Sequence, residues 1–170
     1  MLTVEMIENL LRELNGELQK RDVTGEVGLC GGAVMCLVFK TRCATRNVDG
    51  IFAPAGEMRE AIANVARKLG VAEDWLNDAA KGFFPGDPPK EDVVNYSHLR
   101  VWAPTAEYML AMKCISARYD SFDKDDLVFL VNNLRLKSAN EVFSIVMKFY
   151  PEQKIPVKTR FFVEELLGKS

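Results

Sequence analysis

The sequence has few of the side chains that most often build catalytic or zinc centres. Among its 170 residues His98 is the single histidine, and the four cysteines include no CxxC pair. A structural zinc site needs four such ligands at short spacing, so we do not expect zinc. Catalysis by a Cys–His or Ser–His pair would have to use His98, which lies in the ordinary polar stretch NYSHLR. A structural role is the stronger interpretation of this histidine.

An excess of one charge and a long apolar run are also missing. The 22 basic and 24 acidic residues give a net charge of −2, which offers no overall attraction to nucleic acid or anionic lipid. No apolar run reaches the roughly 18–20 residues that cross a bilayer, and the acidic N-terminal segment is unlike a signal peptide. We therefore expect a cytoplasmic protein without a membrane partner, and cysteines that are reduced and mostly buried.

Hydrophobic periodicity predicts the order of the secondary structure. Hydrophobic residues make up 48% of the chain and charged residues 27%, a balance typical of globular proteins. The pattern predicts helix, strand, helix, strand, helix, strand and then about four helices, which is an α+β fold with a helical C-terminal half. The strands are expected in EVGLC, NVDGIF and LRVWAP, a short helix or turn in WLNDAAKGFF, and a loop in the proline-rich segment 85–90.

The strongest chemical constellation joins a glycine pair to two polar residues on a predicted strand. Gly31 and Gly32 separate a strand from a helix, where backbone N–H groups can approach a phosphate. Asn47 and Asp49 are two residues apart, so on a strand they share a face and could hold Mg²⁺ against that phosphate. Alone, a Gly-Gly pair more often marks a tight turn or close packing.

Five sequence blocks in a fixed order carry a resemblance to a known family. The blocks are GGAVMCLVF, ATRNVDGIF, DWLNDAAKGF, APTAEYMLAMK and SARYDSFDKDDL, and together they cover most of residues 28–150. They resemble the nucleotidyltransferase superfamily, which includes polymerase-β-like transferases and toxins of abortive-infection systems. The likeness is greatest to a bacterial subfamily of uncharacterised nucleotidyltransferase-like proteins.

The resemblance implies an architecture and a metal site. Residues 1–103 would form a nucleotidyltransferase-like α/β core with a small mixed sheet, and residues 104–170 a helical part packed on it as one compact unit. Asp49 and Asn47 would be catalytic residues and metal ligands, and Gly31, Gly32 and Arg46 would contact the nucleotide. The family usually has an aspartate where this chain has Asn47, so one negative charge is missing from the site.

The C-terminal half supplies further candidates on the same resemblance. Lys113 is the predicted catalytic lysine, and Arg118 and Asp126 are predicted to bind the nucleotide. Long cationic side chains can reach triphosphate oxygens, and a carboxylate can orient them. The alternative is an ion pair on a solvated helix face. Asp78 could likewise face the cleft or lie at the surface.

The function implied is nucleotidyl transfer. The protein would bind an NTP with Mg²⁺ or Mn²⁺ and transfer a nucleoside monophosphate to a protein or RNA acceptor. A toxin controlled by a separately encoded antitoxin is compatible with this activity. The alternative is a degenerate, non-catalytic member of the fold that binds a nucleotide or a partner protein, and Asn47 favours it.

Overall fold

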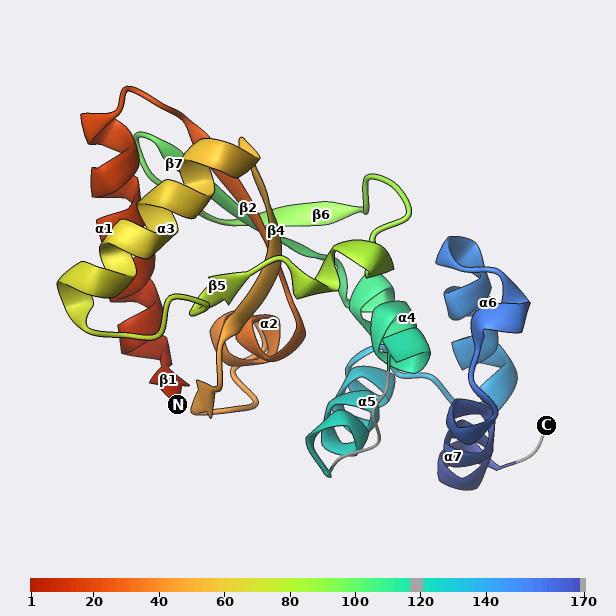
Figure 1. The fold of residues 1–170 in the computed structure, drawn as a ribbon. Coiled ribbons are helices and arrows are strands. Elements are labelled where there is room, and N and C mark those ends of the chain that lie inside the picture. Colours follow the sequence, from red (N-terminus) through yellow and green to blue (C-terminus); the bar gives the residue numbers. More distant parts are fainter. Residues whose placement is uncertain (117–120, 169–170) are drawn as a thin grey trace. The chain divides into compact units, whose positions relative to one another are not determined.

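The computed structural model describes residues 1–116 and 121–168, which divide into two compact units (Figure 1). The first unit comprises Met1–Ala103 and the second Pro104–Ser170. Strands are concentrated in the first unit and helices make up most of the second. The predicted α+β class with a helical C-terminal half is therefore confirmed.

A five-stranded mixed sheet forms the centre of the first unit. Its strand order is β5-β4-β2-β7-β6, with β2 antiparallel to β4 and parallel to β7, while β4 is parallel to β5. The three predicted strands occupy its middle. The strands are β2 (Gly25–Cys30), β4 (Val48–Ala53), β5 (Leu76–Asn77), β6 (Lys90–Asn95) and β7 (Leu99–Pro104).

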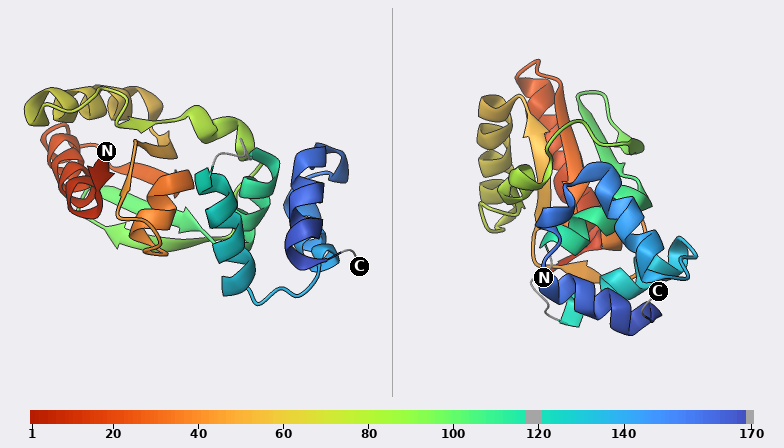
Figure 2. Two further views of the ribbon diagram at one scale, coloured as in Figure 1. Left: turned by 90° about the horizontal axis from the view of Figure 1, so that it is seen from below. Right: turned by 90° about the vertical axis from the view of Figure 1, so that its right-hand side faces the viewer.

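Two amphipathic helices cover one face of this sheet (Figures 1 and 2). They are α1 (Val4–Lys20) and α3 (Ala55–Leu69), and Leu18 and Met58 from them meet the sheet at Gly25. Val27 and Leu29 are fully buried, as alternate residues of β2 that face a helical layer should be. Part of the core of this unit lies between the two helices and that face, and buried residues of helix α2 (Gly31–Leu37), such as Val34 and Met35, form another part.

A short helix and a second, two-stranded sheet adjoin the end of β2. Helix α2 (Gly31–Leu37) starts directly after β2, as the glycine pair predicted. Strand β1 (Leu2–Thr3) pairs antiparallel with β3 (Ala44–Thr45). Residues 46–47 then form a bend that takes the chain from this small sheet to β4 in the large one. The expected strand over 47–52 therefore begins one residue late, at Val48.

Two strands of the large sheet were not predicted from the sequence. β5 has only two residues and is followed by a 3₁₀ helix, η1 (Ala79–Phe83), where a helix or turn was expected. β6 starts at the end of the proline-rich segment that was interpreted as a loop. It is an edge strand, and the charged, exposed Glu91 and Asp92 suit an edge that must not pair with another chain.

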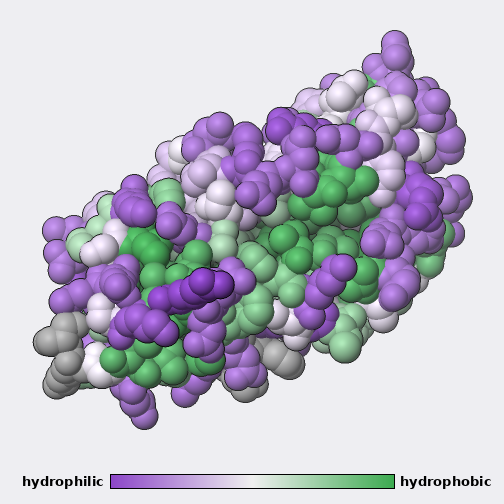
Figure 3. Space-filling view, turned by 180° about the vertical axis from the view of Figure 1, so that it is seen from behind, coloured by the Kyte–Doolittle hydropathy of each residue, from purple (hydrophilic) through white to green (hydrophobic). Residues whose placement is uncertain are grey.

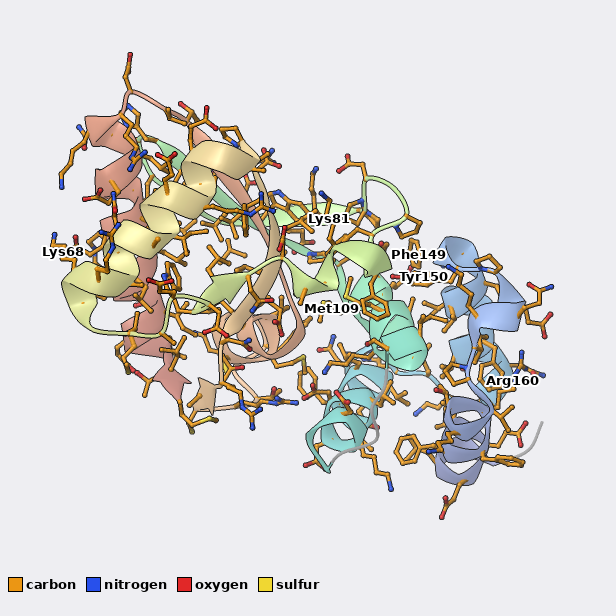
Figure 4. The ribbon with its side chains drawn as sticks, viewed as in Figure 1. Lys68, Lys81, Met109, Phe149, Tyr150 and Arg160 are labelled. Carbon is orange, nitrogen blue, oxygen red and sulfur yellow. The ribbon has the colours of Figure 1, made fainter. Side chains whose placement is uncertain are left out.

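The second unit consists of packed helices. A capping box of Ser138 and Glu141 starts α6. Phe149 and Tyr150 at the end of α6 pack on Tyr108 of α4, with ring centroids 4.9 and 6.1 Å from that of Tyr108 (Figure 4). The helices are α4 (Ala106–Ser116), α5 (Ser121–Asn133), α6 (Ala139–Phe149), η2 (Glu152–Lys154) and α7 (Val157–Leu167).

The molecular surface mixes hydrophilic and hydrophobic areas (Figure 3). Large apolar side chains that stay exposed in the second unit include Met147, Val157, Phe161 and Leu166. In the described part of the chain, no helix combines the length and the apolar character that a membrane span requires.

Candidate functional site

Three polar or small side chains lie in one row across adjacent strands. Cys30 of β2 pairs with Asp49 of β4, and Asp49 pairs with Asn77 of β5. Directly paired residues point to the same side of a sheet, and that side alternates along each strand. Because Leu29 faces α1 and α3, the row lies on the opposite face.

Asp49 meets the glycine turn. Gly31 has φ +59°, a left-handed conformation that glycine adopts without strain. A Cβ atom placed on Gly31 would lie 3.3 Å from Asp49 Oδ2, so the carboxylate lies directly against the backbone of the turn. Any side chain at position 31 would crowd this oxygen.

Gly32 has a packing role of its own. A Cβ atom there would lie 2.5 Å from Thr45 Oγ1 and 3.5 Å from Arg42 Nη1. Thr45 is buried, so it could not move aside easily. The close-packing interpretation of the glycine pair thus holds for Gly32. The structure also brings the Arg42 guanidinium to the turn, whereas the predicted nucleotide contact Arg46 is exposed in the following bend.

Asn47 lies outside the strand that was expected to carry it. It is half-buried in the bend directly before β4. The rule that residues two apart share a face applies within a strand, so it does not fix Asn47 on the side of Asp49. The physical reason is the change of sheet between β3 and β4, which needs a bend at this point.

Asn77 is a neighbour of Asp49 that the sequence analysis did not select. Its Nδ2 donates a hydrogen bond to Asp49 Oδ1 at 3.1 Å, and its Oδ1 accepts one from the backbone N–H of Ala79 at 3.0 Å. The next residue, Asp78, forms instead an ion pair of 2.9 Å with Arg59. Asn77 belongs to the block DWLNDAAKGF, but that pattern alone did not distinguish it from Asp78.

Lys113 forms a buried ion-pair cluster in the second unit. Its Nζ lies 2.8 Å from Asp123 Oδ1 and 2.7 Å from Asp126 Oδ2, and its side chain is only 10% exposed. These two ion pairs join α4 to α5, and they do not lie on a solvated face. Arg118, the other predicted cation, lies outside the described residues. Asp49 belongs to the first unit and Lys113 to the second, so the catalytic role that the resemblance implies for Lys113 beside Asp49 stays a prediction.

Cys30, Cys36 and Cys114 are buried, whereas Cys43 is exposed. Burial raises the pKa of the Cys114 thiol to about 12, so this thiol is protonated at neutral pH. His98 lies in the turn between β6 and β7, where its backbone N–H donates to Asn15 Oδ1 and its Nδ1 is 3.0 Å from Ser97 Oγ. These contacts agree with a structural histidine.

The side chains around Asp49 fit a cation that takes most of its oxygen ligands from bound phosphate and water. In the described residues, no three His, Cys, Asp or Glu side chains cluster closely enough to hold a metal ion. Mg²⁺ is commonly bound by one or two carboxylates together with phosphate oxygens and water. A single carboxylate beside a backbone turn fits that mode better than a site formed by protein alone.

Comparisons of the chain with protein-family models, with curated proteins and with solved structures found no match. The candidate site consists of Asp49, the turn at Gly31 and the amide of Asn77.

Proposed function

We propose that the first unit binds a nucleoside triphosphate with Mg²⁺ or Mn²⁺ at Asp49 and transfers a nucleoside monophosphate to a protein or RNA acceptor. The supporting observation is the Asp49 carboxylate. It is half-buried, lies against the backbone of Gly31, and projects from the sheet face opposite α1 and α3. A carboxylate beside a backbone turn can hold a cation next to phosphate oxygens.

Four residues would bind the nucleotide and the cation, and they come from the glycine turn, from β4 and from the segment between them. Asp49 Oδ2 would be the principal protein ligand, with the amide oxygen of Asn47 as a weaker one. The turn at Gly31 would admit the phosphates, and the Arg42 guanidinium would balance their charge. With Mg²⁺ held by Asp49, the cation would supply polarisation of the α-phosphate and would neutralise charge on the leaving pyrophosphate. An oxygen of the acceptor hydroxyl would form a bond to the α-phosphorus. The bond between the α-phosphorus and the oxygen that bridges it to the β-phosphorus would break, so that pyrophosphate leaves. The hydroxyl proton would be lost to solvent.

A second candidate function is binding without turnover. It is favoured by Asn47, which contributes no charge and lies in a bend before the strand. A site with a single carboxylate leaves more of the metal and phosphate charge to be balanced by water. In this case the same turn would bind a nucleotide or a partner and release it unchanged.

Asn47→Asp and Asp49→Ala distinguish the two functions. If the protein is a transferase weakened at position 47, Asn47→Asp should tighten Mn²⁺ binding and raise the transfer of label from α-³²P-labelled NTPs, because it restores a carboxylate. Asp49→Ala should abolish both. The matched control is Asp78→Ala, which removes a carboxylate whose partner is Arg59, and it should leave transfer unchanged.

The outcomes separate clearly. If the wild type transfers label as fast as Asn47→Asp or faster, the asparagine at position 47 does not weaken the transferase activity. If the wild type and Asn47→Asp both bind NTP without transferring label, and Asp49→Ala does not bind it, the results support binding without turnover. NTP binding that survives Asp49→Ala contradicts both functions.

A further inference from the structure

We propose that Asn77 is a positioning residue, which holds the Asp49 carboxylate so that Oδ2 is the oxygen available to a divalent cation. This inference rests on the proposed function, and it assigns the role of a residue that is not itself a ligand. It depends on two hydrogen bonds and on the strand register that brings their atoms together.

The orientation of the Asn77 amide is fixed by its two partners. Nδ2 donates to Asp49 Oδ1, and Oδ1 accepts from the N–H of Ala79. Exchanging the two amide atoms would place an oxygen against a carboxylate oxygen and an NH₂ group against an N–H, so both contacts would become repulsive. The amide therefore presents its donor to Asp49.

The backbone also holds Asn77 in place. β5 runs parallel to β4 with Asn77 paired to Asp49, and the N–H of Val48 donates to the carbonyl of Trp75 at 2.6 Å. Trp75 is buried and its Nε1 donates to the carbonyl of Ile62 in α3. A two-residue strand anchored in this way can position a side chain with little freedom.

The hydrogen bond makes the two oxygens of Asp49 unequal. Oδ1 accepts the hydrogen bond of the amide, while Oδ2 is the oxygen that faces the turn at Gly31. A carboxylate so held can offer one oxygen to a cation without first losing rotational freedom. Partners of this kind, one step removed from the metal, typically change metal affinity or activity by about 10–100-fold when they are removed.

Asn77→Ala tests the proposal by Mn²⁺ binding, followed by electron paramagnetic resonance in the presence of a non-hydrolysable ATP analogue. We expect binding about 10–100-fold weaker than in the wild type. The matched control is Asn64→Ala, which removes another asparagine amide that donates to a carboxylate, that of Glu17 in the helical layer. It should leave Mn²⁺ binding unchanged.

A second measurement needs no substitution at Asn77. The side-chain amide resonances of Asn77 should shift when Mg²⁺ and the ATP analogue are added to the wild type, and should move in Asp49→Asn without any metal. Those of Asn64 should do neither. This readout reports the hydrogen bond itself and remains usable if Asn77→Ala does not fold.

The results distinguish this inference from the proposed function. Weaker Mn²⁺ binding in both Asp49→Ala and Asn77→Ala, with the amide shifts, supports positioning. If Mn²⁺ binding is lost in Asp49→Ala but unchanged in Asn77→Ala, the positioning role of Asn77 is wrong and the proposed nucleotide site at Asp49 stands. Unchanged binding in Asp49→Ala overturns both.

Discussion

Lys113→Met is expected to lower the free energy of unfolding by about 3–5 kcal/mol, because it removes the cation from a buried ion-pair cluster with the carboxylates of Asp123 and Asp126. The Asp126 side chain is only 2% exposed, and its Oδ2 lies 2.7 Å from Lys113 Nζ. Methionine has a similar length but no charge, so it keeps the packing while it removes the pairing. Chemical denaturation followed by circular dichroism measures the change.

A control and a double variant separate charge from packing. Lys148→Met breaks an exposed ion pair with Glu107 in the same unit, and such pairs contribute about 0–1 kcal/mol. Lys113→Met combined with Asp126→Leu removes the two most buried charges of the cluster and leaves Asp123, whose side chain is 17% exposed, so it should recover part of the lost stability. A loss below about 1 kcal/mol for Lys113→Met alone would contradict a buried, structurally required pair.

Gly28→Ala is expected to destabilise the first unit by about 3 kcal/mol, the upper part of the usual range for overpacking. A Cβ atom on Gly28 would overlap the indole ring of Trp102. That ring is 2% exposed, its Nε1 donates to Glu26 Oε1 at 2.7 Å, and Lys90 Nζ lies 4.7 Å from its centroid. The indole ring is rigid and is held by these contacts with Glu26 and Lys90, so β2 and β7 must shift apart to make room for the methyl group.

Gly16→Ala is the matched control for this change. Gly16 lies inside α1, and a Cβ atom there would meet nothing within 4 Å. Replacing an unhindered glycine in a helix by alanine should stabilise by about 0.5–1 kcal/mol. Unfolding monitored by tryptophan fluorescence should therefore move in opposite directions for the two variants. A Gly28→Ala protein as stable as the wild type would contradict the packing of Trp102 on this glycine.

The parts of the fold that were predictable are those with a clear local signal. The periodic apolar residues of α1 and α3 and the break at Gly31 indicated two helices and a strand end, and the structure has them. The local pattern also predicted that Asp49 lies on a strand. These features depend on residues close together in the sequence.

The features that were missed depend on long-range pairing. β5 has two residues and exists because it pairs with β4, so no local periodicity marks it. The pairing of β4 with β5 also decides that Asn77, and not Asp78, lies beside Asp49. The burial of Lys113 was also hidden, because all residues from Tyr108 to Cys114 in α4 are buried and a lysine there has no solvated face to occupy.

The most direct test of the candidate site is the paramagnetic broadening of backbone amide signals by Mn²⁺ in the presence of a non-hydrolysable ATP analogue. A cation held by Asp49 at the glycine turn should broaden the amide signals of Gly31 and Asp49 strongly, and that of Leu14 in the opposite helical layer much less. In Asp49→Ala this broadening should disappear. Signals of Gly31 and Asp49 that stay sharp in the wild type, or broadening at Gly31 that persists in Asp49→Ala, would contradict a metal–nucleotide site at this turn.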